Sequence, residues 1–142
     1  MLKGKKILLG VTGGIAVYKS PGICSLLRKL GAEVKVIMTK NATEFVRPLT
    51  FQTMSNNVVH AEMFNQLFNM DVEHISLAKW ADIIVIAPAT ANIIGKFANG
   101  IADDMLSTVL MASRSKVMLA PGMNTVMLNS EANKKNMEIL RD

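Results

Sequence analysis

Four stretches of this sequence hold residues suited to chemistry, and each directly follows a run of apolar residues. The first is a glycine-rich turn, GVTGGIA at residues 10–16. Glycines let backbone N–H groups approach a phosphate, and the start of a following helix adds a favourable field. The turn lacks the G-x-G-x-x-G spacing of dinucleotide sites. It is therefore either a phosphate loop or a tight turn that binds no ligand.

The second stretch ends in Thr39 and Lys40. A classical NAD site has an Asp or Glu near this point, where the carboxylate binds the ribose hydroxyls. A hydroxyl and a cation suit a terminal phosphate better, which favours a mononucleotide such as FMN over NAD. For Lys40 alone, a solvated surface lysine is the favoured interpretation.

The third and fourth stretches carry hydrogen-bonding side chains among small residues. Thr90 and Asn92 follow the run ADIIVIAPA, where small residues let a flat ring lie against the backbone. The two side chains are suited to bind the edge of such a ring and to cap the next helix, and the two roles are compatible; for Asn92, capping is the structural alternative. Asn124 stands in a Pro-Gly turn, and its amide can donate to a carboxylate or accept from an amine. An ordinary turn asparagine is an equal alternative for Asn124.

The chain has two histidines and one cysteine. His74 lies close to Asp71 and Glu73, and a lone imidazole in such a place is more often structural or exposed than catalytic. For His60 we adopt the structural interpretation outright. Neither histidine nor Cys24 has the spacing of metal ligands, so the sequence predicts no metal site.

Alternating strand-like and helix-like segments must position these residues. A parallel sheet with helices on both faces is the arrangement that such alternation predicts, and ligands bind beyond the carboxyl ends of its strands. The apolar runs predict strands at residues 5–11, 33–38, 81–87 and 116–120, with a short one at 58–59. The predicted helices span residues 20–30, 42–54 with a break at Pro48, 76–80, 92–99, 103–113 and 130–140.

Length and composition narrow the class of protein. A chain of 142 residues predicts one domain, and 50% hydrophobic with 19% charged residues excludes a disordered chain. No apolar run reaches the roughly 18 residues of a membrane helix, and the run after Lys6 is too short for a signal peptide. A single cysteine fits a reducing, cytoplasmic location. The charge of +5 with only 5% aromatic residues argues against nucleic acid and suits anionic small molecules.

Four segments of the sequence match motifs of a single family: GVTGGIAVYK, MTKNATEFV, HISLAKWADIIVIAPATANIIGKFANGIADDMLS and APGMNTVML. Through them the chain resembles the flavin-dependent cysteine decarboxylases, which include the phosphopantothenoylcysteine decarboxylases and the lantibiotic decarboxylases. The resemblance is strongest to the decarboxylase half of the bacterial bifunctional coenzyme A biosynthesis protein. It extends over essentially the whole chain, and the order of the histidine, PATAN-like and PxMNxxM motifs is quite specific.

The resemblance implies a three-layer, Rossmann-like (flavodoxin-like) α/β fold, an FMN cofactor and a role in coenzyme A biosynthesis. The implied reaction is oxidative decarboxylation of 4'-phosphopantothenoylcysteine to 4'-phosphopantetheine. His74 takes the position of the catalytic histidine, Asn124 that of the residue that binds the substrate carboxylate, and Met127 lies in the same motif. The implied FMN contacts are Gly13, Gly14, Ile15, Thr39, Thr90, Ala91, Asn92, Gly122 and, from a neighbouring subunit, Ser107. The family also implies a homotrimer or a dodecamer of trimers.

The chain departs from the family pattern at two positions. Leu128 replaces a usual Trp, and Gly122 replaces a common Ala. The family's reductive-step cysteine lies in a flap beyond the PxMN motif. We therefore expect residues 1–142 to form one FMN-binding domain without that flap or a synthetase domain. Two alternatives remain: a flavin prenyltransferase, against which the asparagine of PGMN argues, and a non-catalytic flavin-binding subunit.

Overall fold

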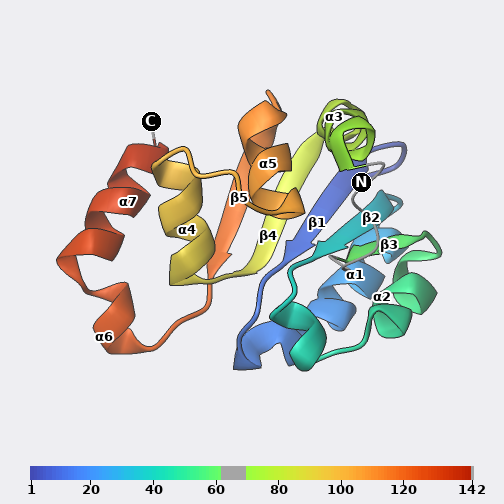
Figure 1. The fold of residues 1–142 in the computed structure, drawn as a ribbon. Helices are drawn as coiled ribbons and strands as arrows, with labels where there is room; N and C mark the ends of the chain where they lie inside the picture. Colours follow the sequence, from blue (N-terminus) through green and yellow to red (C-terminus); the bar gives the residue numbers. More distant parts are fainter. Residues whose placement is uncertain (62–69, 142) are drawn as a thin grey trace.

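A computed structural model describes residues 1–61 and 70–141 of the chain (Figure 1). Its described strands form one sheet in the order β3-β2-β1-β4-β5, and every pairing is parallel. This confirms the predicted parallel sheet. The strands are β1 (Lys6–Val11), β2 (Glu33–Met38), β3 (Val59–Ala61), β4 (Ile83–Ala89) and β5 (Lys116–Pro121).

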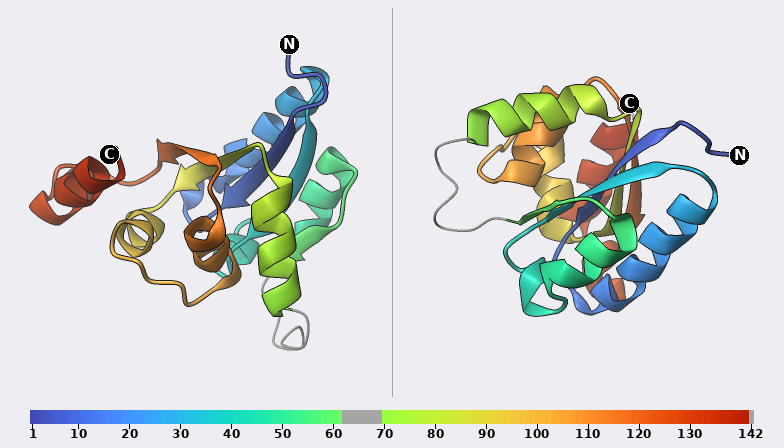
Figure 2. Two further views of the ribbon diagram at one scale, coloured as in Figure 1. Left: turned by 90° about the horizontal axis from the view of Figure 1, so that it is seen from above. Right: turned by 90° about the vertical axis from the view of Figure 1, so that its right-hand side faces the viewer.

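Helices lie on both faces of the sheet (Figure 2). One face carries the 3-10 turn η1 (Ile15–Lys19), α1 (Ser20–Lys29) and α2 (Pro48–Ser55). The other face carries α3 (Met70–Trp80), α4 (Ala91–Ala98) and α5 (Met105–Ala112), with α7 (Glu131–Arg141) packed against α4. Two short pieces complete the described elements, η2 (Ala42–Glu44) and α6 (Thr125–Leu128). In the part of the chain described, no helix combines the length and apolarity needed to cross a membrane.

Alternating side chains of the central strands build two separate apolar layers. Leu8 of β1 packs with Ile84 and Ile86 against residues of α3, α4 and α5. Leu9 and its neighbours on the opposite side pack against α1 and α2. Each fully buried Leu or Ile contributes roughly 1.5–3 kcal/mol relative to exposure. These two layers hold the sheet between its helices and make the three-layer fold.

A parallel sheet with helices on both faces implies that its strands are buried on both faces, and β5 departs from this. Val117 and Leu119 pack against the layer formed with α4 and α5, whereas Met118, which points to the opposite side, is 63% exposed. The prediction is wrong here because β5 is the edge strand, and α1 and α2 contact β2 on that side of the sheet.

Several predicted boundaries also change. Pro48 does break the predicted helix 42–54, since α2 begins at that residue. The helix before β4 begins at Met70 rather than Ser76. Pro88 does not end β4; the strand continues to Ala89, and its pairing with β5 shifts register where the proline lacks an N–H. The sequence analysis missed α6, a helix of four residues.

Gly10 lies in β1 where no larger side chain fits. A Cβ there would lie 2.6 Å from Cδ1 of Ile86 and 2.8 Å from Cδ1 of Leu106, and both of these side chains are buried. We therefore expect Gly10→Ala to lower the free energy of unfolding by about 1–3 kcal/mol through overpacking. Urea denaturation measures this change.

Gly22 provides the matched control, because it lies in α1 and a Cβ there would meet no atom within 4 Å. Gly22→Ala should leave stability unchanged or raise it by up to about 1 kcal/mol. Equal effects of the two substitutions would contradict the packing argument.

Candidate functional site

A cavity of about 490 Å³ lies at the carboxyl ends of the strands. Its walls come from the segments that follow β1, β2, β4 and β5, together with one face of α4 and the residues before α5. The volume falls within the range of roughly 300–1,000 Å³ found for small-molecule sites. This cavity therefore lies at the edge of the sheet where the sequence predicted a ligand site.

Seven of the predicted site residues line this cavity: Gly13, Thr39, Thr90, Ala91, Asn92, Gly122 and Met127. They come from four separate chain segments that the parallel sheet brings to one edge. Lys40, for which a solvated surface lysine was the favoured interpretation, also lines the cavity. The other lining residues were not predicted as site residues: Thr12, Asn41, Ile93, Lys96, Asp103, Asp104 and Met123.

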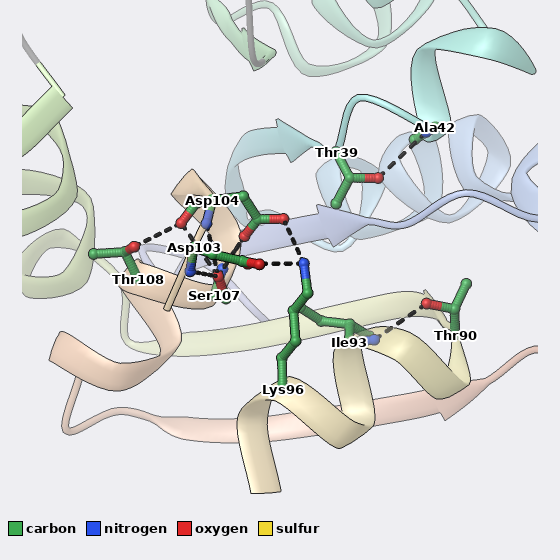
Figure 3. A network of polar contacts seen from close by, with 9 residues as sticks. All are labelled: Thr39, Ala42, Thr90, Ile93, Lys96, Asp103, Asp104, Ser107 and Thr108. Atoms are coloured by element: carbon green, nitrogen blue, oxygen red, sulfur yellow. Dashed lines mark hydrogen bonds and ion pairs between the residues drawn. The ribbon is translucent and has the colours of Figure 1, made fainter. Parts of the chain in front are cut away.

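Thr12, directly after β1, connects the end of this strand to the end of β4 at the cavity. Its buried hydroxyl donates to the carbonyl of Pro88 at 2.5 Å and accepts from the backbone N–H of Thr90 at 3.1 Å. Thr90 in turn caps α4, because its Oγ1 accepts from the N–H of Ile93 at 3.3 Å (Figure 3). This chain of bonds fixes the start of α4 relative to the end of β1. Of the two roles considered for Thr90, helix capping is thus the one seen directly.

Two glycines leave bare backbone at the cavity wall. A Cβ on Gly13 would lie 2.5 Å from Cβ of Asn41, and a Cβ on Gly122 would lie 2.8 Å from Cβ of Pro88. At both positions a neighbouring segment already fills the space that a side chain would take, so glycine allows these segments to pack closely at the cavity wall. Between these walls, Thr39 uses its Oγ1 to accept from the N–H of Ala42 at 3.3 Å (Figure 3).

Lys96 forms a polar cluster with the start of α5 (Figure 3). Its Nζ lies 2.8 Å from Oδ1 of Asp103 and 3.6 Å from Oδ2 of Asp104. Asp104 also caps α5, since its Oδ1 accepts from the N–H of Ser107 at 2.8 Å. The sequence placed both aspartates near a helix N-terminus but gave no signal for Lys96, because the loop that returns the chain to it cannot be read from spacing.

The Lys96–Asp103 contact changes the ionisation of both groups. The hydrogen bond from Lys96 lowers the pKa of the Asp103 carboxyl, and the same bond raises the pKa of Lys96. The pair is therefore fully charged between the ordinary pKa values of an aspartate and a lysine. Asp103 is exposed, with 60% of its side chain accessible, so solvent screening keeps the contribution of the pair to stability small.

Five predicted site residues do not line the cavity: Gly14, Ile15, His74, Ser107 and Asn124. Ile15 is exposed, and the Ser107 hydroxyl accepts from the N–H groups of Asp103 and Asp104. Asn124 neighbours the cavity residue Met123 and caps α6.

His74 is only 6% exposed, and its Nε2 has no hydrogen-bond partner among the residues that the structure describes. Cys24 lies in α1, is buried in the layer between this helix and the sheet, and does not line the cavity; burial raises the pKa of its thiol to about 11.

Comparison with known proteins gives consistent matches along the whole chain. The sequence model of the Flavoprotein family matches residues 1–142. The coenzyme A biosynthesis bifunctional protein CoaBC of Bacillus subtilis is 51% identical over 140 residues, which cover 99% of this chain and 34% of that protein. The chain spans about a third of the length of the curated relatives it matches.

Solved structures share the fold. MrsD from Bacillus sp. HIL-Y85/54728 superposes with a TM-score of 0.88 at 32% identity, covering 99% of this chain and 80% of its own. A mutant PPC decarboxylase complexed with pantothenoylaminoethenethiol superposes with a TM-score of 0.81 at 29% identity, covering 96% of this chain and 77% of its own.

Thr12 provides a test of the cavity wall. Thr12→Val removes the hydroxyl that bonds Pro88 and Thr90, leaving two backbone groups without their partner. An unsatisfied buried group costs about 1–3 kcal/mol, and we expect at least that loss in the free energy of unfolding. Thr12→Ser keeps the hydroxyl and should lose clearly less. If Val proves as stable as Ser in urea denaturation, the hydroxyl does not hold this wall.

Proposed function

Because this chain belongs to the flavoprotein family, we propose that its cavity binds FMN. We also propose that it catalyses the oxidative decarboxylation of 4'-phosphopantothenoylcysteine in coenzyme A biosynthesis, as a cytoplasmic enzyme. The observation that carries the proposal is the cavity itself, which gathers Gly13, Thr39, Thr90, Asn92 and Gly122 at one edge of the sheet. The names of its relatives support the reaction, since they include coenzyme A biosynthesis proteins and a PPC decarboxylase.

The residues of the cavity fit a flavin mononucleotide. The main chain of Gly13, in the turn after β1, lines the cavity and can approach a phosphate, and Gly122 lines it from the segment after β5. The ammonium of Lys40, which has no ion pair with any described residue, is available for a phosphate. Lys96 is already paired with Asp103 and Asp104, so we assign the phosphate to the end of the cavity that holds Lys40.

The reaction explains why a cofactor is needed. Direct loss of the carboxylate from a cysteine amide would leave an unstabilised carbanion. When bound, the flavin supplies the oxidation of the carbon that carries the thiol, which makes the loss of carbon dioxide possible. The protein must orient the substrate and move its protons.

Asn124 is suited to bind the substrate carboxylate. Its Oδ1 accepts from the N–H of Met127 at 2.9 Å, which fixes the amide at the start of α6. The Nδ2 group has no partner within the described part of the chain and can donate to an anion. Met123 and Met127, on either side of this turn, both line the cavity, and we propose that Met127 contacts the substrate.

His74 is suited to exchange a proton with the substrate. A buried ring nitrogen without a partner is rare in proteins and calls for an explanation. A role in proton exchange with the substrate would explain it. His74 does not line the cavity of its own chain, so its proposed role requires a site that extends beyond that cavity.

We therefore propose that the chain assembles as a homotrimer or as a dodecamer of trimers, with each flavin site at a subunit contact. Exposed apolar side chains next to the cavity segments support an interface there. Ile15 is 83% exposed and Val126 is 82% exposed. Light scattering of the FMN-loaded protein at micromolar concentration should give the mass of three chains or a multiple of three. A monomer peak under these conditions would contradict the assembly.

The central test adds 4'-phosphopantothenoylcysteine to the FMN-loaded protein without oxygen and follows the visible absorbance. The parent should bleach as the flavin is reduced. His74→Asn should remain folded and yellow but bleach slowly. Asn124→Asp should also stay folded, because Asp caps a helix as well as Asn does. Its substrate affinity should fall roughly 10- to 150-fold, as expected when an interaction with a charged group worth about 1.5–3 kcal/mol is lost.

Two controls accompany these variants. Asn129→Asp introduces the same charge at the other end of α6, and His60→Asn makes the same substitution at the second histidine. Both controls should bleach like the parent. If His74→Asn or Asn124→Asp also bleaches at the rate of the parent, the role proposed for that residue is wrong. A parent chain that cannot be reconstituted with FMN would refute the cofactor.

A further inference from the structure

The charges that line the cavity are unevenly distributed. Lys40, beside Gly13 and Thr39, adds a positive charge to the segments after β1 and β2. Between α4 and α5, Lys96 faces two carboxylates, Asp103 and Asp104. This cluster of three carries a net charge of −1, from one ammonium and two carboxylates. All three residues line the cavity, so any ligand that fills it lies in their field.

Lys96 is not needed to cap α5. Asp104 performs that role with Oδ1, through the N–H and hydroxyl of Ser107 at 2.8 Å and 2.5 Å. Lys96 instead approaches Oδ2 of Asp104 and Oδ1 of Asp103. The ammonium therefore offsets the negative charge of the two carboxylate oxygens that it contacts, neither of which takes part in the cap of α5. Its side chain is only 17% exposed, which weakens solvent screening of this charge toward the cavity.

We propose that Lys96 sets the reduction potential of the bound flavin by stabilising its reduced form. This inference rests on the proposed FMN site. The substrate gives up two electrons and two protons from its S–H and the adjacent C–H. The flavin takes both electrons and one proton, so its ring gains one negative charge, and the second proton leaves to solvent. A fixed ammonium on the cavity wall favours the form with the added charge, whereas the two carboxylates alone would oppose it.

Lys96→Met tests the proposal, because it keeps a long side chain and removes the charge. We expect the ratio of the dissociation constants of reduced to oxidised FMN to rise at least tenfold. For a two-electron couple, a tenfold change corresponds to a midpoint potential lower by about 30 mV. Dye-coupled redox titration at low ionic strength, where screening is weakest, measures this shift without any decarboxylation.

Charge rescue separates an electrostatic role from a structural one. Adding Asp103→Asn to Lys96→Met returns the net charge of the cluster to −1, and the ratio should move back toward that of the parent. Lys96→Arg keeps the charge and should stay within about twofold of the parent. Lys116→Met is the matched control. It removes the same charge at the amino end of β5, whereas the cavity lies at the carboxyl ends of the strands, and it should leave the ratio unchanged.

Each result bears on one claim. If Lys96→Met binds FMN with the potential of the parent, the role of Lys96 is refuted while the FMN site stands. If the parent itself fails to bind FMN, the proposed cofactor fails instead. Should Lys96→Met not fold, Lys96→Gln replaces it, because it removes the same charge and keeps a polar group toward the two carboxylates. An unchanged or higher potential in Lys96→Gln overturns the inference.

Discussion

All described strands of the sheet run in the same direction, and the site depends on this constraint. Parallel strands place their carboxyl ends at one edge, so the chain leaves β1, β2, β4 and β5 at neighbouring points. Residues as far apart in sequence as Gly13 and Gly122 then line one cavity. The two apolar layers keep this edge fixed. A shift of one residue in a central strand would move every side chain of that strand to the opposite face of the sheet, where it would not fit the packing.

The hydroxyl of Thr12 transfers that rigidity to the cavity. It bonds both Pro88 and Thr90, at the point where the proline cannot take part as a donor in the ladder between β4 and β5. The same bonds lead into the cap of α4. The helix that carries Lys96 thus starts at a position set by the sheet. Through these bonds, the loop residues that line the cavity are held in position by the packed sheet.

The sequence predicted the sheet and much of the cavity because the relevant signals are local. The turn at residues 10–16 and the capping Thr90 each follow directly after an apolar strand. An apolar run with small or polar residues directly after it can be recognised without a structure. Lys96 could not be predicted this way. It reaches its partners through a turn at Gly100, whose φ of +69° allows a reversal that spacing does not reveal. The burial of β5 was overestimated for a related reason, because an apolar run does not tell an edge strand from a central one.

The contrast between Lys40 and Lys96 suggests how one cavity can treat two kinds of negative charge. Lys40 is exposed and has no ion pair within the described chain, so it can meet a phosphate that is charged from the moment of binding. Lys96 is ion-paired with Asp103 and Asp104, and it cannot form an ion pair with a phosphate without giving up those contacts. A charge that develops only during reaction needs a different partner, one already in place before the charge forms. The ion pairs that would withhold Lys96 from the proposed phosphate also fix its ammonium at the cavity wall, and this preorganisation would suit the proposed flavin, whose ring changes its charge on reduction.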